Sequence, residues 1–100
     1  MADRTASTVW EGDLPSGKGR TTFESSGLAS DVPVSWPART EEPNGQTSPE
    51  ELIAAAHSAC FSMAFSNQLA KRGGTPERLE TSATVTFVPG TGITRSALTV

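Results

Sequence analysis

The sequence predicts an α+β domain in which an antiparallel sheet packs on one long central helix. Residues 52–65 form the longest apolar stretch, inside a helix expected over 49–72 with helix-start and helix-stop signals at its ends. Residues 79–88 alternate apolar and polar side chains, which is typical of a half-buried strand. The part before residue 47 holds short extended pieces separated by glycine, proline and serine, as in hairpins.

Length and composition limit what the chain can bury by itself. Its 100 residues, 35% of them hydrophobic, suit a single domain (1–100) with one modest core. Much of that apolar content lies in the one helix. We therefore expect the helix to bury part of its surface against a second chain.

Charge and cysteine usage exclude several classes of protein. The net charge is −3, and the eight Lys and Arg are scattered, so nucleic acid and anionic membranes are poor partners. A single cysteine cannot build a disulfide framework within the chain. The N-terminus lacks a signal-peptide pattern, and the apolar stretch is too short to span a bilayer. These features predict a soluble, cytoplasmic protein.

The N-terminal half is expected to begin with a hairpin. Residues 8–10 and 20–25 read as strands, and the glycine-rich segment 14–19 between them reads as a turn. Residues 28–36 contain or adjoin two prolines, so this segment is an edge strand or an ordered loop.

The central helix has the clearest local signals. Ser48 is a good N-cap, Pro49 suits the first helical position, and Glu51 completes a capping box. Lys71-Arg72 suits the negative end of the helix dipole, and Gly73-Gly74 stops the helix. Because no charged residue lies between Glu51 and Lys71, we expect a helix covered on several sides.

The C-terminal part is expected to form a second hairpin. The strand over 79–88 is followed by a turn at 89–92 and a returning strand over 93–100. The sequence stops within that strand.

Cys60 lies within a run from Leu52 to Phe65 in which only three residues are polar. A free cysteine in such a run is most often a buried hydrophobe, and the pattern alone favours this interpretation. His57, three residues earlier on the same helix face, could form a dyad or a metal pair with it. A hydrogen-bonded core histidine is the simpler account, because two ligands do not make a zinc site.

Three further charged residues stand near the helix start. Glu51 is explained by the capping box, whereas Glu50 has no dedicated local role. Arg39 precedes the helix in a segment expected to be a loop, where an arginine is usually solvated. The glycine-lysine-glycine at 17–19 is too short to indicate a phosphate loop.

The helix segment PEELIAAAHSACFSMAFS, preceded by Thr47 and Ser48, resembles the signature of the OsmC/Ohr family, the osmotically inducible and organic hydroperoxide resistance proteins. The upstream segments WEGDLPSGKGRTTFESSGL and VPVSWPARTEE are similar to the first strands of its OsmC branch. This resemblance implies an OsmC-like intertwined homodimer and a thiol-dependent peroxidase, an oxidoreductase acting on organic hydroperoxides with a thiol reductant. It calls for no metal, haem or flavin.

The resemblance also implies a site. The peroxidatic cysteine falls on Cys60, the catalytic glutamate on Glu50, and the arginine of an aromatic-x-x-Arg pattern on Arg39. Thr40 departs from the pattern, since the family usually carries an aromatic or aliphatic residue there. The family's resolving cysteine belongs to a C-terminal segment that follows the positions present here, so the sequence reads as an N-terminal portion.

Physical chemistry is consistent with these roles. The thiolate, not the thiol, attacks a peroxide. An arginine stays protonated and can hold a thiolate, while a glutamate can fix the arginine through a bidentate pair. Five apolar residues could line a site for a bulky organic tail: Leu52, Phe61, Met63, Phe65 and Trp36. The alternative is a binding module of the same fold, without enzymatic activity, whose pocket takes an apolar ligand.

The spacing of Glu50 and Cys60 raises a geometric question. Ten residues of unbroken helix place them about 15 Å apart along the axis and roughly 80° apart around it. One arginine of the same subunit could hardly reach both. Either the helix breaks near residues 54–56, or two chains share the site, and the alanines there give no reason for a break.

Overall fold

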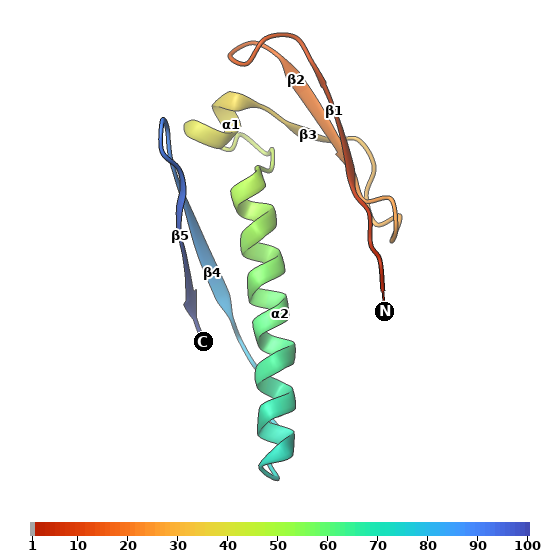
Figure 1. Ribbon diagram of the computed structural model, residues 1–100, viewed down its shortest axis with the longest axis vertical. Helices are drawn as coiled ribbons and strands as arrows, with labels where there is room; N and C mark the ends of the chain where they lie inside the picture. Colours follow the sequence, from red (N-terminus) through yellow and green to blue (C-terminus); the bar gives the residue numbers. More distant parts are fainter. Residues whose placement is uncertain (1) are drawn as a thin grey trace. The chain divides into compact units, whose positions relative to one another are not determined.

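The computed structural model describes residues 2–100 as two compact units, an N-terminal unit ending at Ser48 and a C-terminal unit, Pro49–Val100 (Figure 1). The α+β class is confirmed. The strands form two separate antiparallel sheets, whereas the sequence analysis expected one. No helix within residues 2–100 combines the length and the apolar character needed to cross a membrane.

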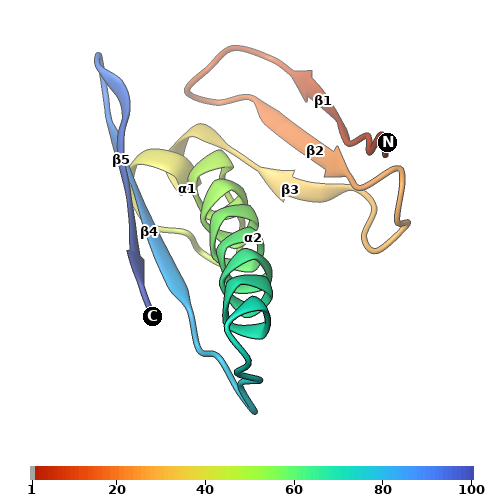
Figure 2. The same ribbon diagram turned by 60° about the horizontal axis from the view of Figure 1, so that its bottom comes forward.

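The N-terminal unit is built on a three-stranded antiparallel sheet in the order β1-β2-β3 (Figure 2). Its strands are β1 (Ser7–Glu11), β2 (Lys18–Thr22) and β3 (Val32–Val34). The predicted hairpin is confirmed, but β2 begins two residues earlier than expected and ends at Thr22. The ladder extends toward the turn because Lys18 pairs with Glu11, and it ends early because residues 24–26 form a turn.

The turn between β1 and β2 is closed by its own polar groups. The Oδ1 atom of Asp13 accepts hydrogen bonds from the backbone N–H (2.9 Å) and the hydroxyl (2.5 Å) of Ser16. These two bonds stabilise the carboxylate and lower the pKa of Asp13. The amide of Gly17 donates to the carbonyl of Asp13 at 2.8 Å. Side-chain capping of this kind is the mechanism by which Asp favours turns.

Strand β3 lies at one edge of this sheet, as Pro33 requires. A short helix α1 (Trp36–Thr40) follows, where the sequence analysis expected only loop. Ser35 is its N-cap, because the Ser35 hydroxyl accepts a hydrogen bond from the Ala38 amide at 3.3 Å. Pro37 lies in the first turn, where a proline is well tolerated. Arg39 is therefore a helical residue, and its placement in a loop was wrong.

The C-terminal unit pairs the long helix α2 (Pro49–Lys71) with a two-stranded sheet. The helix begins and ends where the sequence predicted. Gly73 adopts a φ of +85°, and the amide of Gly74 donates to the carbonyl of Leu69 at 2.9 Å. This left-handed glycine with its backward hydrogen bond is a common way to end a helix.

Strands β4 (Ser82–Val88) and β5 (Gly92–Thr99) form the predicted second hairpin. Alternate residues of β4 are half-buried, as the sequence pattern indicated, and α2 packs against this strand. The register shifts between Thr86 and Phe87, whose partners are Arg95 and Ile93. Thr94 is thus an extra residue, a β-bulge.

Burial is incomplete along α2. Of the residues in this helix only Glu50 is buried, and no hydrophobic side chain between residues 2 and 100 is buried. The half-buried positions lie on the face toward the β4–β5 sheet, while the opposite face is exposed. Within the C-terminal unit, α2 is therefore covered on one side only, so the expectation of a helix covered on several sides stays a prediction.

Gly19 is a specific packing requirement of the N-terminal sheet. A Cβ atom at this position would lie 2.7 Å from Cε3 of Trp10 and 2.7 Å from Cγ2 of Val34. We expect Gly19→Ala to destabilise the N-terminal unit by about 1–3 kcal/mol, the usual cost of overpacking. Urea unfolding followed by tryptophan fluorescence measures this effect, since both tryptophans, Trp10 and Trp36, belong to this unit.

Gly74→Ala is the matched control, because its Cβ atom would meet only the Leu69 carbonyl oxygen at 3.5 Å, an ordinary contact. A Gly19→Ala variant as stable as this control would show that Trp10 and Val34 move apart easily.

Candidate active site

Cys60 lies in the middle of α2 and is exposed to solvent. The interpretation of this residue as a buried space-filling side chain is therefore wrong for the single chain. At about 100° per residue, Cys60 lies roughly opposite Ser58 and Ser62 around the helix. Ser62 faces the hairpin side, since its hydroxyl donates to the Thr81 hydroxyl at 2.8 Å. Cys60 is thus at the centre of the uncovered face.

The residues around Cys60 on this face are apolar or small. Met63 is 73% exposed and Ile53 39% exposed, and both lie within about 60° of Cys60 around the helix. Phe61 and Phe65, whose ring centroids are 5.8 Å apart, lie roughly 100–140° away. Among the four predicted lining residues on α2, the helix therefore places Met63 near the thiol and turns the two phenylalanines away from it.

His57 is half-buried, and its Nδ1 atom lies 2.7 Å from the hydroxyl oxygen of Ser96 on β5. This hydrogen bond ties the helix to the hairpin. It supports the interpretation of His57 as a satisfied structural histidine. Ser96 was not identified from the sequence, because an exposed serine in a strand carries no distinguishing signal.

Glu50 occupies the first turn of α2 and is only 7% exposed. Burying a carboxylate is costly unless it is paired or hydrogen-bonded. Glu51, its neighbour in the same turn, is exposed. The two glutamates therefore differ, as expected if Glu51 serves the helix end and Glu50 has another role.

The helix is continuous from Pro49 to Lys71, so the break considered near residues 54–56 is absent. Glu50 and Cys60 accordingly remain about 15 Å apart along the axis. Their angular separation is roughly 80°. The two groups share one rigid element, and that element alone does not bring them together.

Arg39 belongs to the N-terminal unit, where α1 holds it half-buried. Its guanidinium carbon lies 6.0 Å from the ring centroid of Trp36, one helical turn earlier. At this distance a guanidinium and an indole face attract each other. The Ser35 hydroxyl, which caps α1, also donates to Oε1 of Gln46 at 2.8 Å. Arg39 is thus carried by a short helix with a defined start.

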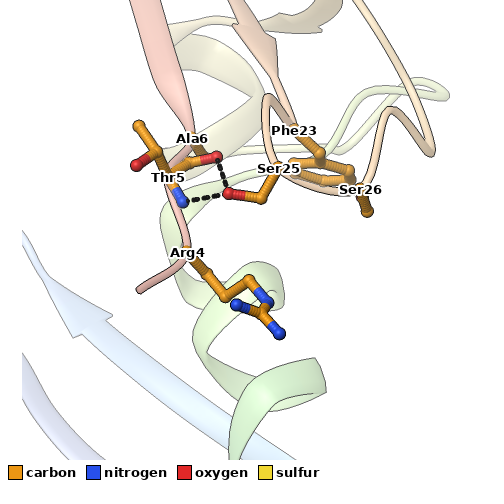
Figure 3. Close-up of a pocket in the computed structure, with 6 residues that line it drawn as sticks. All are labelled: Arg4, Thr5, Ala6, Phe23, Ser25 and Ser26. Atoms are coloured by element: carbon orange, nitrogen blue, oxygen red, sulfur yellow. Dashed lines mark hydrogen bonds between the residues drawn. The ribbon is translucent and has the colours of Figure 1, made fainter. Parts of the chain in front are cut away.

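A hollow of about 370 Å³ opens beside the first strand (Figure 3). Several of the polar groups that line it form hydrogen bonds with one another. The backbone amide of Thr5 donates to the hydroxyl of Ser25 at 2.5 Å, and that hydroxyl donates back to the Thr5 carbonyl at 3.4 Å. The guanidinium of Arg4 donates to the Asp3 carbonyl at 2.9 Å. The backbone groups of Thr5 and the hydroxyl of Ser25 are therefore already hydrogen-bonded.

Residues 2–100 contain no group of three or more His, Cys, Asp or Glu placed to hold a metal ion.

The long helix carries a buried glutamate in its first turn and an exposed cysteine ten residues later. The family described as OsmC-like protein matches residues 42–100, a range that includes Glu50 and Cys60, and the chain belongs to this family. Arg39 lies just before the matched range.

Among curated proteins, the chain is similar to Peroxiredoxin OsmC of Escherichia coli (strain K12), with 46% identity over 92 residues. The aligned region covers 89% of this chain and 63% of that protein. Peroxiredoxin OsmC of Shigella flexneri matches with the same identity and coverage. The chain thus spans less than two thirds of the length of these relatives.

The assignment of His57 to structure rather than catalysis can be tested. We expect His57→Ala to lower stability by about 1 kcal/mol, the usual contribution of one hydrogen bond. The reaction rate of Cys60 with iodoacetamide should stay near the wild-type value, because the imidazole is engaged with Ser96.

Ser96→Ala is the matched variant and should reproduce the stability loss. A large fall in alkylation rate for His57→Ala, with no such fall for Ser96→Ala, would contradict the structural role and indicate a Cys–His dyad.

Proposed function

We propose that this protein is a thiol-dependent peroxidase that reduces organic hydroperoxides to alcohols through Cys60. The observation that carries the proposal is the position of its one cysteine, which is solvent-exposed among apolar residues on the helix matched by the OsmC-like family. The name of its curated relatives, Peroxiredoxin OsmC, supports the same class of reaction.

The proposed reaction begins with attack of the Cys60 thiolate on one oxygen of the hydroperoxide. An S–O bond forms, the O–O bond breaks, and the alkoxide leaves with a proton as an alcohol. Sulfur is oxidised to sulfenic acid, and the peroxide is reduced. A thiol reductant then displaces water from the sulfenic acid, forming a mixed disulfide, and a second thiol releases Cys60 in its reduced form.

Arg39 and Glu50 have distinct roles in this proposal. The guanidinium of Arg39 stabilises the thiolate and the negative charge that develops on the peroxide oxygens. Glu50 fixes the orientation of Arg39 through a charge-assisted pair, for which its burial is suited. The exposed apolar side chains Met63 and Ile53 contact the organic part of the substrate, which favours organic hydroperoxides over hydrogen peroxide.

We further propose that the active form is an intertwined cytoplasmic homodimer. The proposal is supported by the absence of any buried hydrophobic side chain in residues 2–100 and by the exposed apolar face of α2. Glu50 and Cys60, held apart by the unbroken helix, would then belong to sites completed by two chains.

Replacing the thiol tests the chemistry. Cys60→Ser is near-isosteric, and its hydroxyl is not appreciably ionised at neutral pH, so we expect complete loss of cumene hydroperoxide reduction in the presence of dithiothreitol. Ser58→Ala is the matched control, since Ser58 lies on the opposite side of the same helix and its hydroxyl donates to the Ala55 carbonyl at 3.2 Å.

Circular dichroism is the measurement that checks whether both variants fold. Turnover that persists in Cys60→Ser would refute the peroxidatic role. A wild-type protein that binds apolar ligands yet keeps its thiol unoxidised under hydroperoxide would favour the binding-module alternative.

Subunit mixing tests whether two chains share the site. We expect Glu50→Gln and Cys60→Ser each to be inactive alone, whereas mixed dimers regain one site with both wild-type groups. Random pairing at equal concentrations gives about a quarter of the wild-type activity for a two-fold dimer.

The control mixes Glu50→Gln with the double variant Glu50→Gln/Cys60→Ser, which cannot restore any site. Differently tagged subunits prove that exchange has occurred. If exchange is complete and activity stays at the level of this control, both groups act within one subunit.

A further inference from the structure

The segment between α1 and α2 contains a tight turn at Asn44-Gly45. Asn44 has a φ of +49° and Gly45 a φ of +77°, and the amide of Gln46 donates to the carbonyl of Pro43 at 2.9 Å. Two successive positive φ values match the central residues of a type I′ turn. Asn and Gly are the residues that tolerate this backbone conformation.

Both central residues of this turn are accessible. Asn44 and Gly45 are exposed, and a Cβ atom built on Gly45 would meet nothing within 4 Å. No residue from 2 to 100 accepts a hydrogen bond from the Gly45 amide or contacts the Asn44 carboxamide through a polar bond. Gly45 therefore adds no side chain of its own beside this nitrogen, and its amide has no competing hydrogen-bond acceptor within residues 2–100.

We propose that Asn44-Gly45 is a site of spontaneous deamidation in the folded protein. The backbone nitrogen of Gly45 attacks the side-chain carbonyl carbon of Asn44. A C–N bond forms, the bond to the side-chain nitrogen breaks, and that nitrogen leaves as ammonia with the proton of the Gly45 amide. Water then opens the resulting succinimide, giving aspartate or, by opening at the other carbonyl, isoaspartate. No oxidant or reductant takes part.

The chain carries an internal comparison for this reaction. Its other asparagine, Asn67, lies inside α2 and is followed by Gln68. The helical backbone holds the Gln68 nitrogen in a hydrogen bond and fixes the torsions that ring closure must change. The Gln68 side chain adds steric hindrance that Gly45 lacks. Asn67 should therefore persist under conditions that convert Asn44.

The product changes the connection between the two helices. Either product adds one negative charge to a segment that already contains Glu41 and Glu42. Isoaspartate also routes the main chain through the side-chain carbon, which lengthens the backbone by one atom between α1 and α2. The modification thus alters the link between Arg39 and Glu50 without touching either residue.

The experiment incubates the folded protein at mildly alkaline pH in water enriched in heavy oxygen, then maps peptides by mass spectrometry. We expect heavy-oxygen aspartate and isoaspartate at position 44, formed at least an order of magnitude faster than at Asn67, with a matching acidic species on anion exchange. Protein isoaspartyl methyltransferase labels the isoaspartate product directly.

Two variants sharpen the test. Asn44→Gly keeps a residue that accepts a positive φ and should remove both the label and the acidic species. Asn44→Asp should co-elute with the aspartate product and gain no label. An Asn44 that stays intact in the folded protein, or that converts no faster than Asn67, overturns the proposal. Conversion that appears only after unfolding in urea also overturns it.

Discussion

The C-terminal unit covers only one face of helix α2, and the proposed site depends on this constraint. The β4–β5 hairpin covers one side of the helix, and the opposite side, apolar along much of its length, remains exposed. Each square ångström of apolar surface left in water loses about 25 cal/mol of the stabilising free energy that its burial would contribute. Because no hydrophobic side chain in residues 2–100 is buried, the chain obtains only part of the hydrophobic stabilisation that its apolar residues could give. In the proposed homodimer, a second copy laid against α2 supplies further burial.

Cys60, the proposed reactive group, shares this constraint. Cys60 lies at the centre of the uncovered face, where it is accessible but has no apolar enclosure. In the proposed enzyme, whatever covers the helix also determines how substrate reaches the thiol and how water is excluded from it. The apolar face of α2 that needs burial is therefore also the face that carries the proposed thiolate, which needs shielding from water. This coincidence is the physical reason for linking dimer formation to catalysis in the proposed function.

Local features were predictable from the sequence where the signals were local. Pro49 and Gly73 mark the ends of α2, and the alternation in β4 marks its half-buried face. The division into two sheets and the bulge at Thr94 could not be predicted, because strand pairing is a long-range property. Helix α1 had a readable signal, Ser35 followed by Pro37, but five residues carry too little periodicity to stand out from loop.

The candidate site could be predicted only in part, because the exposure of its residues also depends on long-range contacts. Family resemblance singled out Cys60 and Glu50, whereas their exposure depends on what covers α2. The pattern around Cys60 favoured burial because an apolar run reads the same whether it faces its own chain or another. Glu50 shows the opposite case. A carboxylate at the start of a helix is usually exposed to solvent, yet the structure buries this one.

The contact between Arg39 and Trp36 sets a limit on how far α1 alone can orient the guanidinium. At 6.0 Å it contributes about 0.5–1 kcal/mol. Fixing an arginine side chain in one rotamer costs about 1.5–2 kcal/mol of conformational entropy. The indole contact is therefore too weak to hold Arg39 in one pose, and a catalytic arginine needs a stronger partner. A bidentate carboxylate provides the charge-assisted bonds that offset the difference. In the proposed enzyme Glu50 is that partner, which explains why a residue without any local task in the helix start is the buried one.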